Sequence, residues 1–113
     1  MHHIDKECKT NVESLPDGMA VTKKMAANLL GISRYTLYDY LDGLNNYLAP
    51  HQRPTQWDWQ GEPHEPISKN SLRVLLVLKQ AIYTTKNREY AINNLSRQVE
   101  DYFNGLQQER YEQ

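Results

Sequence analysis

The amino-acid sequence predicts a mainly α-helical fold with one irregular segment near its middle. In four separate stretches, apolar residues recur at intervals of three and four positions, the period of a helix that buries one side. A serine, threonine or asparagine stands just before three of these stretches, where its side chain can cap a helix. Between residues 47 and 66 the helical period is lost and four prolines occur, so we expect a loop or an irregular hairpin there.

Length and charge limit the kind of protein that this chain can be. Its 113 residues suffice for one compact domain with an appended helix, but not for two full hydrophobic cores. The 13 basic and 14 acidic residues give a net charge of -1, which argues mildly against nonspecific adhesion to phosphates. If DNA is the partner, positive charge must therefore be concentrated on one part of the surface.

We expect neither a membrane nor a metal as partner. No apolar run approaches the roughly 20 residues of a spanning helix, and the first residues lack a secretory hydrophobic region, so we predict a cytoplasmic protein. The single cysteine, Cys8, cannot form an internal disulfide, and the four histidines lack metal-ligand spacing. No pattern of catalytic residues is visible either, so we expect neither an enzyme nor a bound cofactor.

Residues 1–20 are predicted to be a flexible N-terminal arm. They mix charges, contain the turn signal Pro16-Asp17-Gly18 and show no sustained apolar period. The folded domain is expected to cover residues 21–87.

Two helices joined by a short turn are predicted at the start of this domain. Thr22 is suited to cap a helix over residues 23–30, and Gly31 ends that helix. Ser33 is suited to cap a second helix, whose leucines recur at i, i+4 and i+7 and which ends at Asn45-Asn46.

The segment after these two helices, residues 47–66, is the expected loop or irregular hairpin. Its Trp57 and Trp59 alternate in the manner of a strand, and we expect both indoles to shield the core rather than to wedge between bases. A third helix, capped by Ser68 or Asn70 and closed between residues 84 and 87, is apolar enough to be central to the core.

The last segment, residues 88–113, is predicted to be a dimerisation helix. Its apolar residues follow steps of three and four, the period of a coiled-coil seam. The seam consists of Ile92, Leu95, Val99, Tyr102 and Leu106. Packing of this stripe on its own domain is the alternative; we favour a homodimer because two half-sites add contact area and discrimination on DNA.

The first two helices satisfy the requirements of a helix-turn-helix. Such a motif needs a small residue in its first helix, a residue tolerant of positive φ in its turn, and apolar residues on the inner side of its second helix. Ala27, Gly31 and Leu37 meet these requirements in order, with Tyr40 beside Leu37. The pattern favours double-stranded DNA as the partner, with a purely structural helical corner as the alternative.

If the second helix enters a major groove, its outward residues meet the DNA. Arg34 is the best single candidate, because its planar guanidinium can pair with guanine or clamp a phosphate. Tyr35 and Tyr38 can reach phosphates or thymine methyl groups, although core packing is an equal alternative for Tyr38. Ser33 and Thr36 offer hydroxyls to the same surface.

Three further charged residues are expected at the DNA. Lys23 and Lys24 begin a helix, where positive charge opposes the helix dipole, so their position makes better sense beside phosphates. Asp39 would repel phosphate, but it can accept a hydrogen bond from cytosine or orient an arginine.

The stretch from residue 25 to residue 44 resembles the DNA-binding domain of MerR-family regulators and their excisionase-like relatives. The matching positions are Ala27, Gly31, Ser33, Thr36, Leu37, Tyr40, Gly43 and Leu44. A weaker similarity continues through residues 50–66 into the third helix. The resemblance implies a winged helix-turn-helix domain, a dimer held by an antiparallel C-terminal coiled coil, and contact between Arg53 in the wing and backbone phosphate.

Together these patterns predict a sequence-specific transcriptional regulator. A dimeric repressor is favoured, because neither an effector domain nor a metal-sensing module is visible, and no small-molecule effector is expected. One alternative is an excisionase-like protein that bends DNA, for which a more basic chain would be expected. Another is a helical adaptor that binds proteins through its third and fourth helices.

Overall fold

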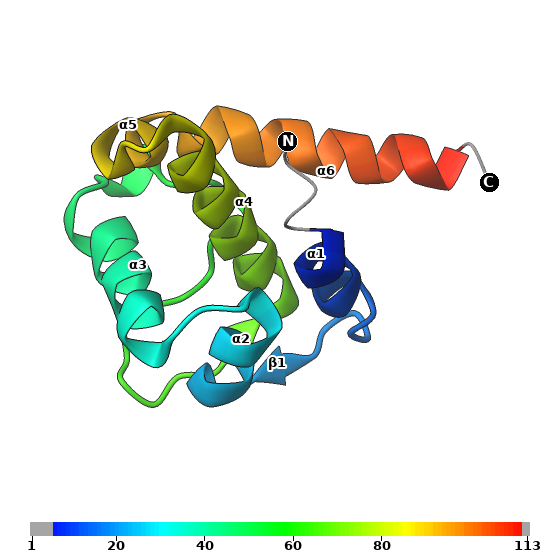
Figure 1. Ribbon diagram of the computed structural model, residues 1–113, viewed down its shortest axis with the longest axis horizontal. Coiled ribbons are helices and arrows are strands. Elements are labelled where there is room, and N and C mark those ends of the chain that lie inside the picture. Colours follow the sequence, from blue (N-terminus) through cyan, green and yellow to red (C-terminus); the bar gives the residue numbers. More distant parts are fainter. Residues whose placement is uncertain (1–5, 112–113) are drawn as a thin grey trace.

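The computed structural model describes residues 6–111 of the chain (Figure 1). Most of this range is helical, which confirms the predicted α-rich fold. In chain order the elements are α1 (Lys6–Glu13), β1 (Ala20–Val21), α2 (Lys23–Leu30), α3 (Arg34–Asn46), the 3-10 helix η2 (Pro50–Gln52), β2 (Ile67–Ser68), α4 (Lys69–Thr85), α5 (Arg88–Asn93) and α6 (Leu95–Tyr111).

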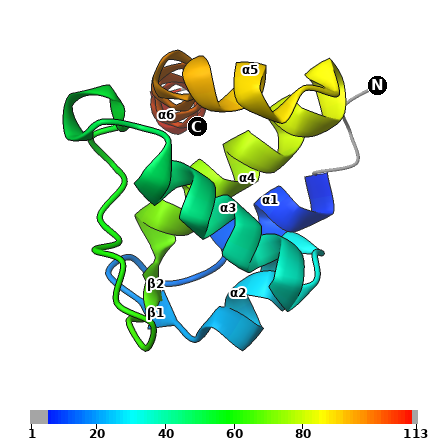
Figure 2. The ribbon, with the colours of Figure 1, turned by 90° about the vertical axis from the view of Figure 1, so that its left-hand side faces the viewer.

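Helix α4 lies at the centre of the molecule, as its apolar sequence predicts. It contacts α1, α2, α5 and α6, which surround it in Figures 1 and 2. Leucine and valine side chains are buried on every side of its first three turns, as expected for a helix that is covered all round. The Ser68 hydroxyl caps it by accepting from the Ser71 amide, so the predicted start of this helix is confirmed.

The corner between α2 and α3 also forms as predicted. Thr22 caps α2 through its hydroxyl, which accepts from the Met25 amide at 3.2 Å. Gly31 ends this helix with a φ of 68°, in the left-handed region that favours glycine. Ser33 then caps α3 by accepting from the Thr36 amide at 3.0 Å. Local capping signals therefore set both helix boundaries.

The middle segment is a long loop that contains η2, and a loop is one of the two forms predicted for it; no hairpin forms within this part of the described residues. The small antiparallel sheet instead joins β1 to β2, with Val21 opposite Ile67. The loop is tied to the start of α4, because the Asp58 carboxylate accepts hydrogen bonds from the hydroxyls of Ser68 and Ser71. Both tryptophans of the loop are buried, as expected for indoles that shield the core.

The N-terminal segment corrects the expectation of a flexible arm. Within it, α1 is helical and packs against α2 and α4, with Cys8 and Val12 buried. Lys69 of α4 donates to the carbonyl oxygens of Glu13 and Leu15 at 3.1 and 2.6 Å, which fixes the end of α1. Residues 6–15 of the expected arm therefore pack on the domain, while residues 16–20 are exposed. Residues 1–5 lie outside the described range.

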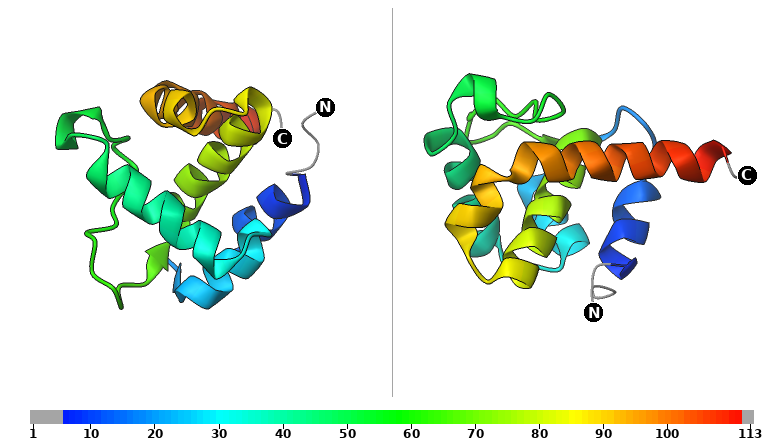
Figure 3. Two further views of the ribbon diagram at one scale, coloured as in Figure 1. Left: turned by 60° about the vertical axis from the view of Figure 1, so that its left-hand side comes forward. Right: turned by 90° about the horizontal axis from the view of Figure 1, so that it is seen from above.

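The C-terminal segment corrects the expectation of one continuous helix. The chain turns at Asn94, whose side chain donates to the Tyr90 carbonyl at 2.9 Å and so competes with the helical backbone bonds. Helix α6 then runs across α4 and extends past α1, as Figures 1 and 3 show. Within the described range, no helix is both long and apolar enough to cross a membrane.

Only the far part of the predicted seam stays partly open. Ile92, Leu95 and Val99 are buried within the protomer, the last two with 0% exposure, so they belong to its own core rather than to a pairing surface. Tyr102 and Leu106 are half-buried. The first half of the apolar stripe therefore packs on its own domain, which is the alternative to dimerisation.

Candidate nucleic-acid interface

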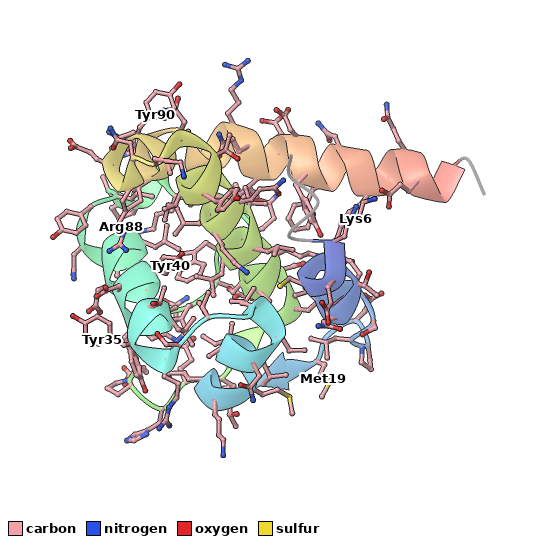
Figure 4. All side chains as sticks on the ribbon, in the orientation of Figure 1. Lys6, Met19, Tyr35, Tyr40, Arg88 and Tyr90 are labelled. Atoms are coloured by element: carbon pink, nitrogen blue, oxygen red, sulfur yellow. The ribbon has the colours of Figure 1, made fainter. Side chains whose placement is uncertain are left out.

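The two sides of α3 differ sharply in exposure. Leu37, Leu41 and Leu44 are buried against the core, and Tyr40 points from α3 toward α4 in Figure 4. The opposite side, over the first two turns of α3, is formed by Arg34, Tyr35 and Tyr38, with the two tyrosines 78% and 46% exposed. This outward surface of α3 is a convex helix side that the described part of the protomer leaves uncovered.

Arg34 is available to a partner on this surface. It is exposed, and its guanidinium makes no hydrogen bond or ion pair within the described residues. It also follows the Ser33 cap directly, so the helix start holds its backbone in place. A planar guanidinium in this position can donate two parallel hydrogen bonds to guanine or to a phosphate.

The predicted hydroxyl contacts are partly used within the helix cap. The Ser33 hydroxyl donates to the Thr36 hydroxyl at 3.0 Å while accepting from the Thr36 amide. Ser33 is exposed and Thr36 is half-buried. The first role of these two hydroxyls is therefore to fix the start of α3.

The two predicted lysines separate into different roles. The ammonium group of Lys23 donates to the carbonyl oxygens of Pro63 and Glu65, the latter at 3.0 Å, and lies 5.6 Å from the centre of the Trp59 ring. It thereby holds the middle loop against α2. Lys24 is exposed beside it and remains oriented to solvent.

Arg53 stabilises the end of α3 in this structure. Its guanidinium donates to the carbonyl oxygens of Asn45 and Leu48 at 2.8 and 3.2 Å. The last carbonyls of a helix lack partners within that helix, and positive charge there interacts favourably with the helix dipole. Arg53 is half-buried, and these two bonds hold its guanidinium at the C-terminal end of α3.

Asp39 pairs with a residue outside the predicted set. Its carboxylate lies 3.6 Å from the guanidinium of Arg88 on α5, which also lies 5.8 Å from the centre of the Tyr40 ring. Arg88 thus provides a partner for the Asp39 carboxylate, which the sequence predicts to face the DNA. The link between α3 and α5 has no local signal in the sequence, because the two residues are far apart in the chain.

A charged network far from α3 joins α1, α4 and α6. Arg73 donates to both carboxylate oxygens of Glu13 at 2.6 and 2.8 Å, and the Tyr102 hydroxyl donates to one of them at 2.9 Å. Burial opposes ionisation of Glu13, but the hydrogen bonds from Arg73 and Tyr102 outweigh it and lower the pKa of that carboxyl. Burial, together with the adjacent carboxylate, raises the pKa of the Tyr102 hydroxyl. The network fixes the direction of α6.

Comparison with protein-family models, with curated proteins and with solved structures yields no match. The resemblance to MerR-family regulators therefore depends on the residues of α2 and α3 themselves. Within the described residues, no group of three or more histidines, cysteines and acidic residues is placed to hold a metal ion.

Proposed function

We propose that this chain is a sequence-specific DNA-binding protein that reads double-stranded DNA with the outward surface of α3. One observation carries the proposal: Arg34, Tyr35 and Tyr38 are exposed on the first two turns of a helix whose other side is buried. Helix-turn-helix proteins use these turns of their second helix to contact base edges.

The support around α3 suits such a role. The Ser33 cap fixes its start, Arg53 binds the Asn45 carbonyl near its end, and Gly31 forms the left-handed turn between α2 and α3. A rigid helix loses little conformational freedom when it enters a groove, which favours binding. Arg34 would pair with guanine, while Tyr35 and Lys24 would approach the flanking phosphates.

The proposed regulator acts as a homodimeric repressor that occupies two half-sites. Tyr102 and Leu106 are half-buried and form the remaining partly exposed apolar surface of the predicted seam, although the Tyr102 hydroxyl also bonds Glu13 of α1. Pairing there would place two copies of α3 on one duplex, and occupation of a promoter would be sufficient for repression.

The proposal is tested by selecting bound sequences from random duplexes and measuring affinity by fluorescence anisotropy. Replacing Arg34 by alanine is expected to weaken binding to the selected duplex by roughly 1–3 kcal/mol, with a smaller loss on a scrambled duplex. Arg97→Ala is the matched control, because Arg97 is an exposed arginine on α6. Equal losses in the two variants would remove α3 as the reading helix.

A further inference from the structure

A cleft separates the second half of α3 from α5. It has a volume of about 750 Å³, and the two helices that border it lie one above the other in Figure 2. Its lining includes Gly43 and the buried side chain of Ile92, while Tyr47, 76% exposed, stands at the end of α3. A Cβ atom on Gly43 would lie 3.2 Å from the Ile92 side chain, so the glycine allows Ile92 to pack closely against α3.

The charges of the α3–α5 cleft are unbalanced. Three carboxylates, those of Asp39, Asp42 and Glu89, line it together with a single guanidinium, that of Arg88. Asp39 and Arg88 pair with each other at 3.6 Å. Asp42 and Glu89 are exposed and form no ion pair within the described part of the chain. Two of the three carboxylates that line the cleft are therefore not paired with a basic side chain of the described residues.

The size of the cleft indicates what can occupy it. The cleft is an open one, and its volume has room for more than one side chain of a partner. Its lining combines apolar surface with carboxylates on both bordering helices, which suits a segment that carries apolar and basic residues together.

We propose that the α3–α5 cleft is a docking site for a basic segment of a partner protein. Lysine or arginine side chains of that segment pair with Asp42 and Glu89, and an apolar neighbour contacts Ile92 and the Tyr47 ring. The uncompensated charges repel phosphate, which separates this site from the outward surface of α3. One end of α3 then binds DNA while the other end binds protein.

The site is tested without DNA by titrating the full chain with a synthetic peptide that repeats Leu-Lys-Lys-Leu. Amide resonances of residues 42–47 and 88–93 are expected to shift in NMR spectra. The double variant Asp42→Asn, Glu89→Gln should weaken the peptide about tenfold, because two charge pairs are lost. The matched control replaces two other exposed carboxylates, Glu62→Gln with Glu100→Gln, and should bind as the parent does.

A reversed pair of charges provides a test that does not depend on loss of binding. The variant Asp42→Lys, Glu89→Lys is expected to bind a peptide that repeats Leu-Glu-Glu-Leu, which the parent does not bind. Absence of this gain, or equal loss in the Glu62 and Glu100 control, would overturn the site. Spermidine producing the same shifts at the same affinity would overturn a protein segment as the occupant.

The docking site and the proposed DNA-binding function are separable in the same variants. The Asp42→Asn, Glu89→Gln chain is expected to bind the selected duplex at least as tightly as the parent, because it keeps Arg34, Tyr35 and Tyr38 and removes two negative charges that repel phosphate. Loss of peptide binding with DNA binding retained supports the cleft independently. If the parent chain binds the peptide but no DNA, the docking site is supported and only the proposed DNA-binding function is contradicted.

Discussion

Helices α3 and α6 carry similar apolar stripes but use them differently. The stripe of α3 is buried along its whole length, and the exposed residues opposite it form a surface that stands free. The stripe of α6 is buried at Leu95 and Val99 and only half-buried at Tyr102 and Leu106. Apolar periodicity therefore predicts that a stripe will be covered, but it does not predict which surface covers it.

The difference arises from what holds each helix. The start of helix α3 is fixed by a local group, the Ser33 cap, and its end is held by Arg53 from the loop that follows. Helix α6 depends on remote ones, since it first packs on α4 and then meets Glu13 of α1 through Tyr102. Local signals are legible in a sequence, whereas remote partners are not.

The largest effect is expected within the stripe of α6. Leu95→Ala should lower the free energy of unfolding by about 3 kcal/mol, because it leaves a cavity in the protomer core. Leu106→Ala, the matched control, should cost less than about 1 kcal/mol, because that leucine is only half-buried. Urea unfolding followed by circular dichroism measures both.

Association of the chain sharpens the same contrast. The Leu106→Ala variant is expected to shift sedimentation toward monomer while its fold is retained. If Leu95→Ala instead gave a stable monomer with unchanged unfolding, the predicted coiled-coil seam would be restored and the contrast between α3 and α6 would be lost.

A smaller effect is expected from the network that directs α6. Glu13→Gln should lower the free energy of unfolding by about 2 kcal/mol at neutral pH, because it leaves the mostly buried Arg73 without its ionic partner. The control Glu100→Gln changes an exposed glutamate of α6 and should cost little.

The pH dependence of this effect has a definite sign. The folded-state pKa of Glu13 is lowered, so its contribution is fully present above the ordinary glutamate value of 4.5. It is lost as the pH falls through the lower folded-state pKa. The difference between parent and Glu13→Gln should therefore shrink below about pH 4.5 in urea unfolding. A difference that stays constant down to pH 3 would exclude ionised Glu13 as the source of the stability.

Much of the fold follows from local sequence signals. Thr22, Ser33 and Ser68 cap the helices that the sequence predicts, and Gly31 provides the left-handed turn. Helix α1 was not predictable in this way, because its few apolar residues are supplemented by Lys69 and Arg73 from α4. The break at residue 94 was hidden because the apolar period continues across it.

The candidate site likewise has a part that the sequence predicts and a part that depends on remote contacts. The exposure of Arg34, Tyr35 and Tyr38 follows once the buried leucines of α3 are known. The roles of Lys23 and Arg53 do not, because both donate to backbone carbonyls whose positions depend on the loops. Sequence patterns therefore indicate which side of α3 is outward, but not which nearby cations remain available to DNA.

The central claim is that the outward surface of α3 enters a DNA groove, and a spin-labelled duplex tests it most directly. With a nitroxide in the major groove of the selected sequence, paramagnetic broadening of amide resonances is expected to be strongest for residues 33–38. Amides of α6 should remain sharp. Strongest broadening in α1 or α6, with residues 33–38 unaffected, would contradict the account.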